Sequence, residues 1–319
     1  MKERNFRQML ENQWSSGKFV CVGLDSESDK IPESLQLLSP KWNAIHLIAA
    51  FNRLIVEATK DLVIAAFNRL IVEATKDLVC AYKPNAAFYE AHGDAGWIAL
   101  KETISYIHEN APEVPVILDA KRADIGNTNK GYIKMAFEYL KADAVTVHPY
   151  LGAEALQPFL DMPDKGIIVL CRTSNPGAGE FQDLHTLSID PNKFPADMDA
   201  DDRLAVLCCD SMRFYERVAQ NVTNTWNKNG NCAVVVGATY PEELQKVRGI
   251  VGDMPILIPA IGAQGGDVEK TVSAGKDSRG KGMIINSSRG IIFASNGPDF
   301  AEAARRETIK LHDLINQYR

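Results

Sequence analysis

Residues 114–128 read VPVILDAKRADIGNT and join a short apolar run to a dense group of charges. The apolar part, residues 114–118, predicts a buried strand. Because side chains alternate along a strand, Asp119 and Lys121 are expected to share one face at its end, with Asp124 following where the chain turns. Removing such charges from water costs free energy. The pattern therefore favours a functional site over a solvated loop with a weak surface ion pair.

Short apolar runs recur along the chain, with helix-like segments between them. They are residues 19–24, 78–82, 114–118, 144–147, 167–171, 233–236, 256–258 and 283–285. Their continuous apolarity is typical of parallel strands covered on both faces. Eight strand–helix units in 319 residues predict one domain, 1–319, with the (β/α)8 TIM-barrel fold. A doubly wound open sheet is the alternative, but the segment after the first run lacks its glycine-rich turn.

Polar residues follow these runs and, in a barrel, would converge on one rim, where active sites lie. They are Asp25, Lys83, Asp119 with Lys121, His148, Thr173 with Ser174, Gly237 with Thr239, Gln264 and Arg289. Lys83 would extend the charges of residues 119–124 into a row of alternating sign, which keeps each group ionised. His148, next to a proline, is expected to be a packed rim residue.

Two glycine-containing segments follow the seventh and eighth runs, at residues 260–266 and 286–290. Free backbone N–H groups can approach an anion there, and Arg289 adds a bidentate fork. Barrels commonly hold phosphate at this place, so the pair predicts a phosphate site. Two tight turns with a surface arginine are the simpler reading of either segment alone.

The bulk composition is that of an ordinary globular protein, 45% hydrophobic and 24% charged with a net charge of −6. No basic run suggests a nucleic-acid partner, and no stretch approaches a membrane span. The six cysteines show neither Cys-x-x-Cys pairs nor zinc spacing. We therefore expect buried free thiols, no metal site and a cytoplasmic protein.

Two segments depart from the regular pattern. Residues 48–63 recur unchanged as 64–79, which indicates a duplication rather than a solenoid repeat. Each copy has a helical apolar face, marked in the first by Phe51, Leu54, Ile55, Ala58 and Leu62. Sixteen residues rotate that face by about 160°, so one copy is expected to dock and the other to be extruded. Residues 174–203 form a long loop, typical of a lid.

The combination of motifs resembles orotidine 5′-phosphate decarboxylase, in the longer bacterial-type branch of that family. It comprises Asp119-x-Lys121-x-x-Asp124 with Ile125-Gly126-Asn127-Thr128, Lys83-Pro84-Asn85, Thr173-Ser174-Asn175-Pro176-Gly177, Gly262-Ala263-Gln264-Gly265-Gly266 and Ser288-Arg289-Gly290. The motifs occur in the family's order, from Asp25 to Arg289. The duplicated segment 48–79 is the departure from the family pattern.

The resemblance implies cofactor-free decarboxylation of orotidine 5′-phosphate to uridine 5′-phosphate in pyrimidine biosynthesis. Lys121 would protonate C6 of the pyrimidine as carbon dioxide leaves, and Asp119 would lie beside the substrate carboxylate and hold Lys121. The implied ligand-binding residues are Lys83 and Asp25 for the ribose, Ser174 for the pyrimidine amide, Gln264 and Arg289 for the phosphate, and Ser288 in the phosphate motif.

In that family the second aspartate of the motif reaches into the neighbouring subunit's site. The resemblance thus implies a homodimer in which Asp124, Ile125 and Thr128 act in trans. Two alternatives remain open: a magnesium-dependent sugar-phosphate aldolase or decarboxylase of the same barrel type, and an inactive binding or scaffold protein. The first would need further carboxylates around a metal, and the second would be signalled by a lost charged motif residue. No such residue is lost here.

Overall fold

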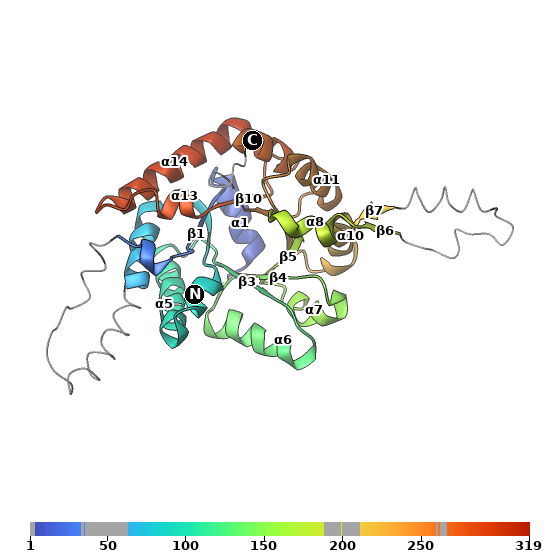
Figure 1. Cartoon of the computed structure of the whole chain (residues 1–319), viewed down its shortest axis with the longest axis horizontal. Helices are drawn as coiled ribbons and strands as arrows, with labels where there is room; N and C mark the ends of the chain where they lie inside the picture. The colour runs from blue at the N-terminus through green and yellow to red at the C-terminus, as the bar shows by residue number, and fades with distance from the viewer. Residues whose placement is uncertain are drawn as a thin grey trace.

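Eight parallel strands form a barrel at the centre of the molecule, with helices outside it (Figure 1). The computed structural model describes residues 4–32, 35, 63–187, 199, 211–259, 261 and 267–319. The barrel strands are β1 (Val20–Gly23), β2 (Val79–Lys83), β3 (Ile117–Arg122), β4 (Ala144–Val147), β5 (Gly166–Arg172), β8 (Cys232–Val236), β9 (Ile256–Ile258) and β10 (Met283–Ser287). Each predicted apolar run coincides with one of them.

The sheet runs in the order β2-β1-β10-β9-β8-β5-β4-β3, and its two end strands meet to close the barrel. Parallel bridges join Tyr82 to Val116 and Asn85 to Asp119 across that seam. The Asp119 amide also donates a hydrogen bond to the Pro84 carbonyl (3.0 Å). The predicted TIM barrel is therefore confirmed, and the open-sheet alternative is wrong.

Helices alternate with the strands and cover the barrel from outside (Figure 1). They are α4 (Ala86–Glu90), α5 (Gly93–Asn110), α6 (Gly126–Ile133), α7 (Gly152–Leu160), α10 (Phe214–Asn221), α11 (Pro241–Val251), α12 (Val268–Gly275), α13 (Arg289–Ile292) and α14 (Phe300–Tyr318). Two helices continue as π-helical turns, η2 (Lys134–Tyr139) and η5 (Val222–Trp226), and η1 (Ser28–Lys30) is a short 3-10 turn. No helix in the described ranges is long and apolar enough to cross a membrane.

Helix α1 (Phe6–Ser15) closes the amino-terminal mouth of the barrel. Its apolar face buries Phe6, Leu10 and Trp14. The Trp14 indole donates to the Met283 carbonyl at the start of β10 (2.8 Å). Phe6 packs where β5 begins, since a side chain on Gly166 would overlap its ring. This end of the barrel is consequently filled, and ligand access is left to the opposite end.

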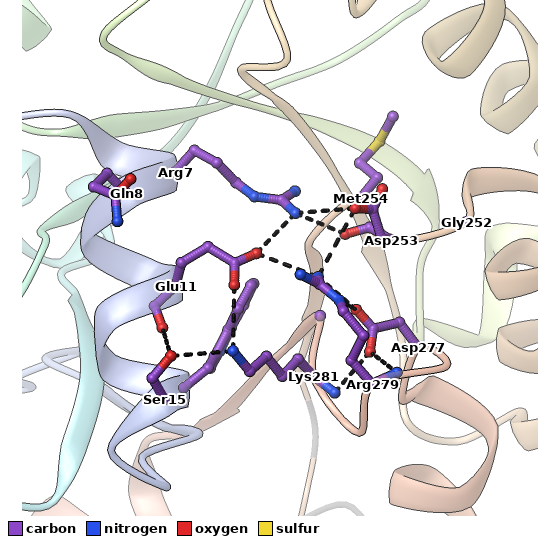
Figure 2. A network of polar contacts seen from close by, with 12 residues as sticks. Arg7, Gln8, Glu11, Ser15, Gly252, Asp253, Met254, Asp277, Arg279 and Lys281 are labelled. Atoms are coloured by element: carbon purple, nitrogen blue, oxygen red, sulfur yellow. Dashed lines mark hydrogen bonds and ion pairs between the residues drawn. The ribbon is translucent and has the colours of Figure 1, made fainter.

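Charged residues hold α1 to the loops around that mouth, as Figure 2 shows. Glu11 accepts hydrogen bonds from Arg7 (2.9 Å) and Arg279 (3.3 Å) and lies 3.6 Å from the Lys281 ammonium. Arg279 in turn pairs with Asp277 at 2.7 Å. Although exposed ion pairs are individually weak, this network holds two loops, around Asp253 and around Arg279, against one helix.

The second copy of the duplicated segment is docked on the barrel. Residues 63–75 are helical and bury Phe67 and Ile71, and the Phe67 ring stacks on Phe300 of α14 with centroids 5.1 Å apart. The predicted apolar face is partly wrong, because Leu70, the counterpart of Leu54, is 41% exposed while the polar Asn68 is fully buried. Asn68 is satisfied there by the hydroxyls of three neighbouring side chains. Residues 48–62 lie outside the described residues.

The predicted long loop carries more regular structure than expected. After β5 come η3 (Pro176–Ala178) and α8 (Gly179–Gln182), followed by β6 (His185–Thr186), which pairs antiparallel with β7 (Met212–Arg213). A short antiparallel pair of strands therefore lies between α8 and α10. Residues 188–198 and 200–210 lie outside the described residues.

Four cysteines are free and buried, as predicted: Cys21, Cys80, Cys171 and Cys232. Burial in apolar surroundings raises the pKa of the Cys21, Cys171 and Cys232 thiols to about 12. These groups are protonated at neutral pH and unreactive. Cys208 and Cys209 lie outside the described residues.

Residues 48–63 and 64–79 are identical, so deleting either copy leaves the same sequence. The shortened protein keeps one copy, which can form the docked helix with its contacts to α14. We expect the thermal unfolding midpoint to change by no more than about 3 °C, as for a change outside the core. Circular dichroism melting would measure it. Phe67→Ala in the shortened protein is the control, expected to cost about 3–5 kcal/mol. Unfolding of the shortened protein itself would show that both copies are needed.

Candidate active site

A cavity of about 540 Å³ opens at the carboxyl ends of the barrel strands. The predicted rim residues that line it are Asp25, Lys83, Asp119, Lys121, Thr173, Ser174, Ser288 and Arg289. Its apolar wall is made by Leu170, Val235, Leu257, Pro259 and Ile261. Charged and apolar groups thus face one another across a space large enough for a small ligand.

Four charges of alternating sign form a row on one side of this cavity. Lys83 at the end of β2 donates to Asp119 Oδ2 (2.9 Å), and its Nζ lies 3.8 Å from Asp25 Oδ1. Lys121 at the end of β3 donates to Asp119 Oδ1 (2.7 Å). The predicted contact between Asp119 and its two lysines is confirmed. Within one chain, however, the row is completed by Asp25 and not by Asp124.

Burial and charge act in opposite directions on this row. Burial disfavours the charged form of Lys83, which is 3% exposed, but attraction to Asp119 and Asp25 outweighs it and raises the pKa of the ammonium. Burial likewise opposes ionisation of Asp119, yet Lys83 and Lys121 hold the pKa of its carboxyl well below the usual range. Asp119 is therefore a carboxylate at neutral pH.

The outer end of the row is open. The Lys121 side chain is 50% exposed, in contrast to Lys83 at 4%. Its ammonium makes one hydrogen bond, to Asp119, and has two further protons to donate. The geometry therefore presents a held proton donor to whatever occupies the cavity.

The phosphate motif is described in part. Ser288 and Arg289 line the cavity at the end of β10, and the Ser288 hydroxyl donates to the Gly23 carbonyl (3.1 Å). Gly23 must lack a side chain here, because its Cβ would lie 2.7 Å from that of Ser288. The Arg289 side chain is exposed and makes no ion pair with a described residue. Gln264 and the rest of 262–266 lie outside the described residues.

Ser174 lines the cavity directly after β5. Gly237 follows β8 and lies against it, so a Cβ at that position would be 2.8 Å from the Ser174 Cβ. Gly237 thus permits the close approach that places Ser174 at the cavity wall.

Asp124, Ile125 and Thr128 do not line the cavity of their own chain. Asp124 Oδ1 accepts from the Ile125 amide (2.7 Å), and its own amide donates to Asn129 (2.7 Å). The Ile125 side chain is 60% exposed. These residues sit at the start of α6, on the surface next to the site. His148 Nε2 donates to the Ala123 carbonyl (3.0 Å) and the His148 amide donates to the Arg122 carbonyl (3.1 Å), as fits the predicted packed rim residue.

Several cavity residues were missed from the sequence. Thr146 on β4, Asn286 on β10 and Gln182 on α8 all line the cavity. Thr146 lies inside the apolar run 144–147, so its polarity was the available signal, and Asn286 directly follows the run 283–285. Asn286 Oδ1 is buried and has no hydrogen-bond partner among the described residues.

Arg172, the last residue of β5, ties the long loop to the barrel. It is 4% exposed and donates to Glu243 of α11 (2.6 Å) and to Gln182 of α8 (3.3 Å). Gln182 also accepts from the Thr173 amide (2.9 Å). The base of the loop is therefore held next to Ser174 by a buried cation.

A metal centre was not expected, and the described ranges contain no group of three or more His, Cys, Asp or Glu side chains arranged to hold a metal ion. The carboxylates of the charged row are engaged by lysines instead. Asp119 accepts from both ammonium groups, one on each oxygen.

Comparisons with known proteins agree with this geometry. The family model described as "Orotidine 5'-phosphate decarboxylase / HUMPS family" matches residues 18–306. Orotidine 5′-phosphate decarboxylase of Cellvibrio japonicus is 42% identical over 313 residues, covering 98% of each chain. The corresponding protein of Ralstonia pickettii is 44% identical over 315 residues, covering 98% of this chain and 99% of that one.

Among solved structures, the OMP decarboxylase of Leishmania donovani superposes with a TM-score of 0.71 at 31% identity, covering 98% of both chains. The UMP synthase of Leishmania donovani gives 0.75 at 33% identity, covering 99% of this chain and 56% of that one. With a family model over most of the barrel and full-length relatives at 42% and 44% identity, the chain belongs to the orotidine 5′-phosphate decarboxylase / HUMPS family.

Proposed function

We propose that this protein decarboxylates orotidine 5′-phosphate to uridine 5′-phosphate, the step that completes a pyrimidine nucleotide. The observation that carries the proposal is the row of Lys83, Asp119 and Lys121 along a cavity that Arg289 also lines. The named activity of relatives identical at 42% and 44% over their whole length supports it. The cytoplasm is the compartment we propose for it.

The reaction must form a carbanion at C6 without a cofactor that could accept its electron pair. The C6–carboxylate bond breaks, carbon dioxide leaves, and the electron pair stays on C6. Lys121 then gives one ammonium proton to C6 and becomes a neutral amine. Its half-exposed Nζ, held by Asp119 at 2.7 Å, is the donor we assign to this step. A fixed cation in a cavity closed to water stabilises negative charge as it develops.

We assign Asp119 and Lys83 to the charge environment of the Lys121 ammonium. We assign Asp119 to the space beside the substrate carboxylate, where its low pKa keeps it charged throughout the reaction. Lys83 balances Asp119 from the buried side at 2.9 Å, and with Asp25 it is placed to bind the ribose hydroxyls. Ser174 is assigned to the pyrimidine amide.

Binding of the 5′-phosphate is assigned to Arg289, Ser288 and Gln264. An arginine fork to a phosphate is a charge-assisted, bidentate contact that supplies binding free energy far from C6. That free energy can drive closure of the loop that begins at residue 174, whose base is fixed by Arg172. Binding free energy from the phosphate would thereby lower the barrier to the reaction at C6.

We further propose a homodimer with shared active sites. Asp124, Ile125 and Thr128 lie on the surface beside the cavity and do not line it. An exposed isoleucine next to a site is explained if it enters a neighbouring subunit. Asp124 of the partner subunit would then extend the charged row past Lys121.

The substrate and the metal dependence of the reaction can be tested together. Loss of orotidine 5′-phosphate absorbance should proceed at the same rate with and without EDTA, since both oxygens of Asp119 are engaged by lysines. Activity that disappears with chelator and returns with magnesium would instead favour the sugar-phosphate aldolase class. Absence of turnover in a folded protein that still binds uridine 5′-phosphate would favour a binding protein.

Replacing the two cations should separate chemistry from binding. Lys121→Ala removes the proton donor, so kcat should fall by about 10³-fold or more while uridine 5′-phosphate still binds. Arg289→Ala should raise KM by about 10–100-fold, the value of a charge-assisted fork. Lys310→Ala, on the exposed face of α14, is the control and should match the wild type. Near-normal kcat in the Lys121 variant would remove it from the mechanism.

Mixing two inactive variants tests the shared site. In a mixed dimer of Asp124→Ala and Lys121→Ala chains, one site retains both groups, and random exchange should restore about a quarter of wild-type activity. Native mass spectrometry would establish that subunits have exchanged. If exchange is complete and activity stays at the level of the separate variants, Asp124 acts within its own chain.

A further inference from the structure

Strand β3 is irregular where it carries the proton donor. Lys121 has φ +49°, in the left-handed region that disfavours residues with a side chain. The pairing of β3 with β4 shifts register between Leu118 and Arg122, so the intervening residues lie outside the regular ladder. Their backbone N–H groups therefore need partners other than β4 carbonyls.

The Thr146 side chain supplies those partners. Its Oγ1 accepts hydrogen bonds from the amides of Ala120 (3.0 Å) and Lys121 (2.9 Å). The residue is 1% exposed, so no bulk water can take its place. One hydroxyl oxygen thus fills the gap that the register shift leaves in the ladder and holds Lys121 in its strained conformation.

The same hydroxyl orients the carboxylate. A hydroxyl oxygen has two acceptor sites and one proton to donate. Both acceptor sites are used by the two amides, so its proton is left for Asp119 Oδ1, at 2.9 Å. Asp119 Oδ1 also accepts a hydrogen bond from Lys121 Nζ. Thr146, Asp119 and Lys121 therefore form one network, which includes both the backbone amide and the ammonium of Lys121.

We propose that Thr146 is a positioning residue for the decarboxylation: its hydroxyl sets the backbone of Lys121 and the carboxylate of Asp119 at once. The inference rests on the proposed function of Lys121 as proton donor. Because Thr146 is β-branched and lies in a strand, its χ1 is restricted and the hydroxyl direction is defined. Its effect is expected on proton delivery by Lys121, and not on phosphate binding.

Valine and serine give a matched test. Thr146→Val keeps the shape and removes the hydroxyl, leaving two buried amides without an acceptor. We expect kcat to fall by about 10–100-fold, while KM and the Kd for uridine 5′-phosphate change by less than about threefold. Thr146→Ser retains the hydroxyl and should keep kcat within about threefold of the wild type. If the valine variant does not fold, Thr146→Ala carries the test with the same expected split.

Thr271→Val is the control for removal of a buried hydroxyl. Thr271 is buried in α12, and its Oγ1 has no partner in the described part of the chain, so kcat should be unchanged. Wild-type kcat in the valine variant, a serine variant as slow as valine, or parallel losses in kcat and nucleotide affinity would each overturn the positioning role. A wild-type protein without decarboxylase activity would refute the proposed function itself, which is a separate outcome.

Discussion

The buried ion pair between Lys83 and Asp119 is the constraint on which the rest of this structure depends. Either charge alone would be costly to bury, and together they are tolerable because each finds opposite charge on two sides. Their strands, β2 and β3, are also the two ends of the sheet, so the pair lies on the seam that closes the barrel. The bridge from Asn85 to Asp119 and the hydrogen bond from Asp119 to Pro84 bring the strand ends together there. Closing the fold and assembling the charged row are thus one event.

The two ends of the barrel are built for different purposes. At the amino-terminal mouth, α1 inserts Phe6, Leu10 and Trp14, and its ion pairs with the surrounding loops need no ligand to be satisfied. At the carboxyl end, by contrast, Asn286 and Asp25 each keep a buried oxygen without a hydrogen-bond partner among the described residues. A buried polar atom without a hydrogen bond destabilises a protein core. In a cavity, a bound ligand can supply the missing hydrogen bond.

The sequence predicted what depends on pattern and missed what depends on backbone detail. Continuous apolar runs located all eight barrel strands, and the polar residues after them located Lys83, Asp119 and Lys121. The alternation of side chains along β3 predicted the contact between Asp119 and Lys121 correctly. It did not predict that Lys121 leaves the regular strand conformation. Thr146 was hidden within an apolar run, since its role depends on a register shift that no local propensity encodes. Leu70 was expected to be buried but is exposed, and the polar Asn68 is buried. Three hydroxyl groups, distant in sequence, form hydrogen bonds with Asn68 and make its burial favourable.

The charge balance of the site bears on how decarboxylation is driven. Asp25 and Asp119 are matched by Lys83 and Lys121, so the row has no spare cation for a further carboxylate. Arg289 also lines the cavity, and we assign it to the phosphate in the proposed function. A substrate gripped by its phosphate would therefore bring its carboxylate to a row that is already neutral and includes the fixed negative charge of Asp119. Loss of carbon dioxide removes that extra charge, and the electron pair left on C6 develops beside Lys121. In the proposed mechanism, the array would stabilise the carbanion better than the carboxylate from which it forms, and such differential binding lowers a barrier.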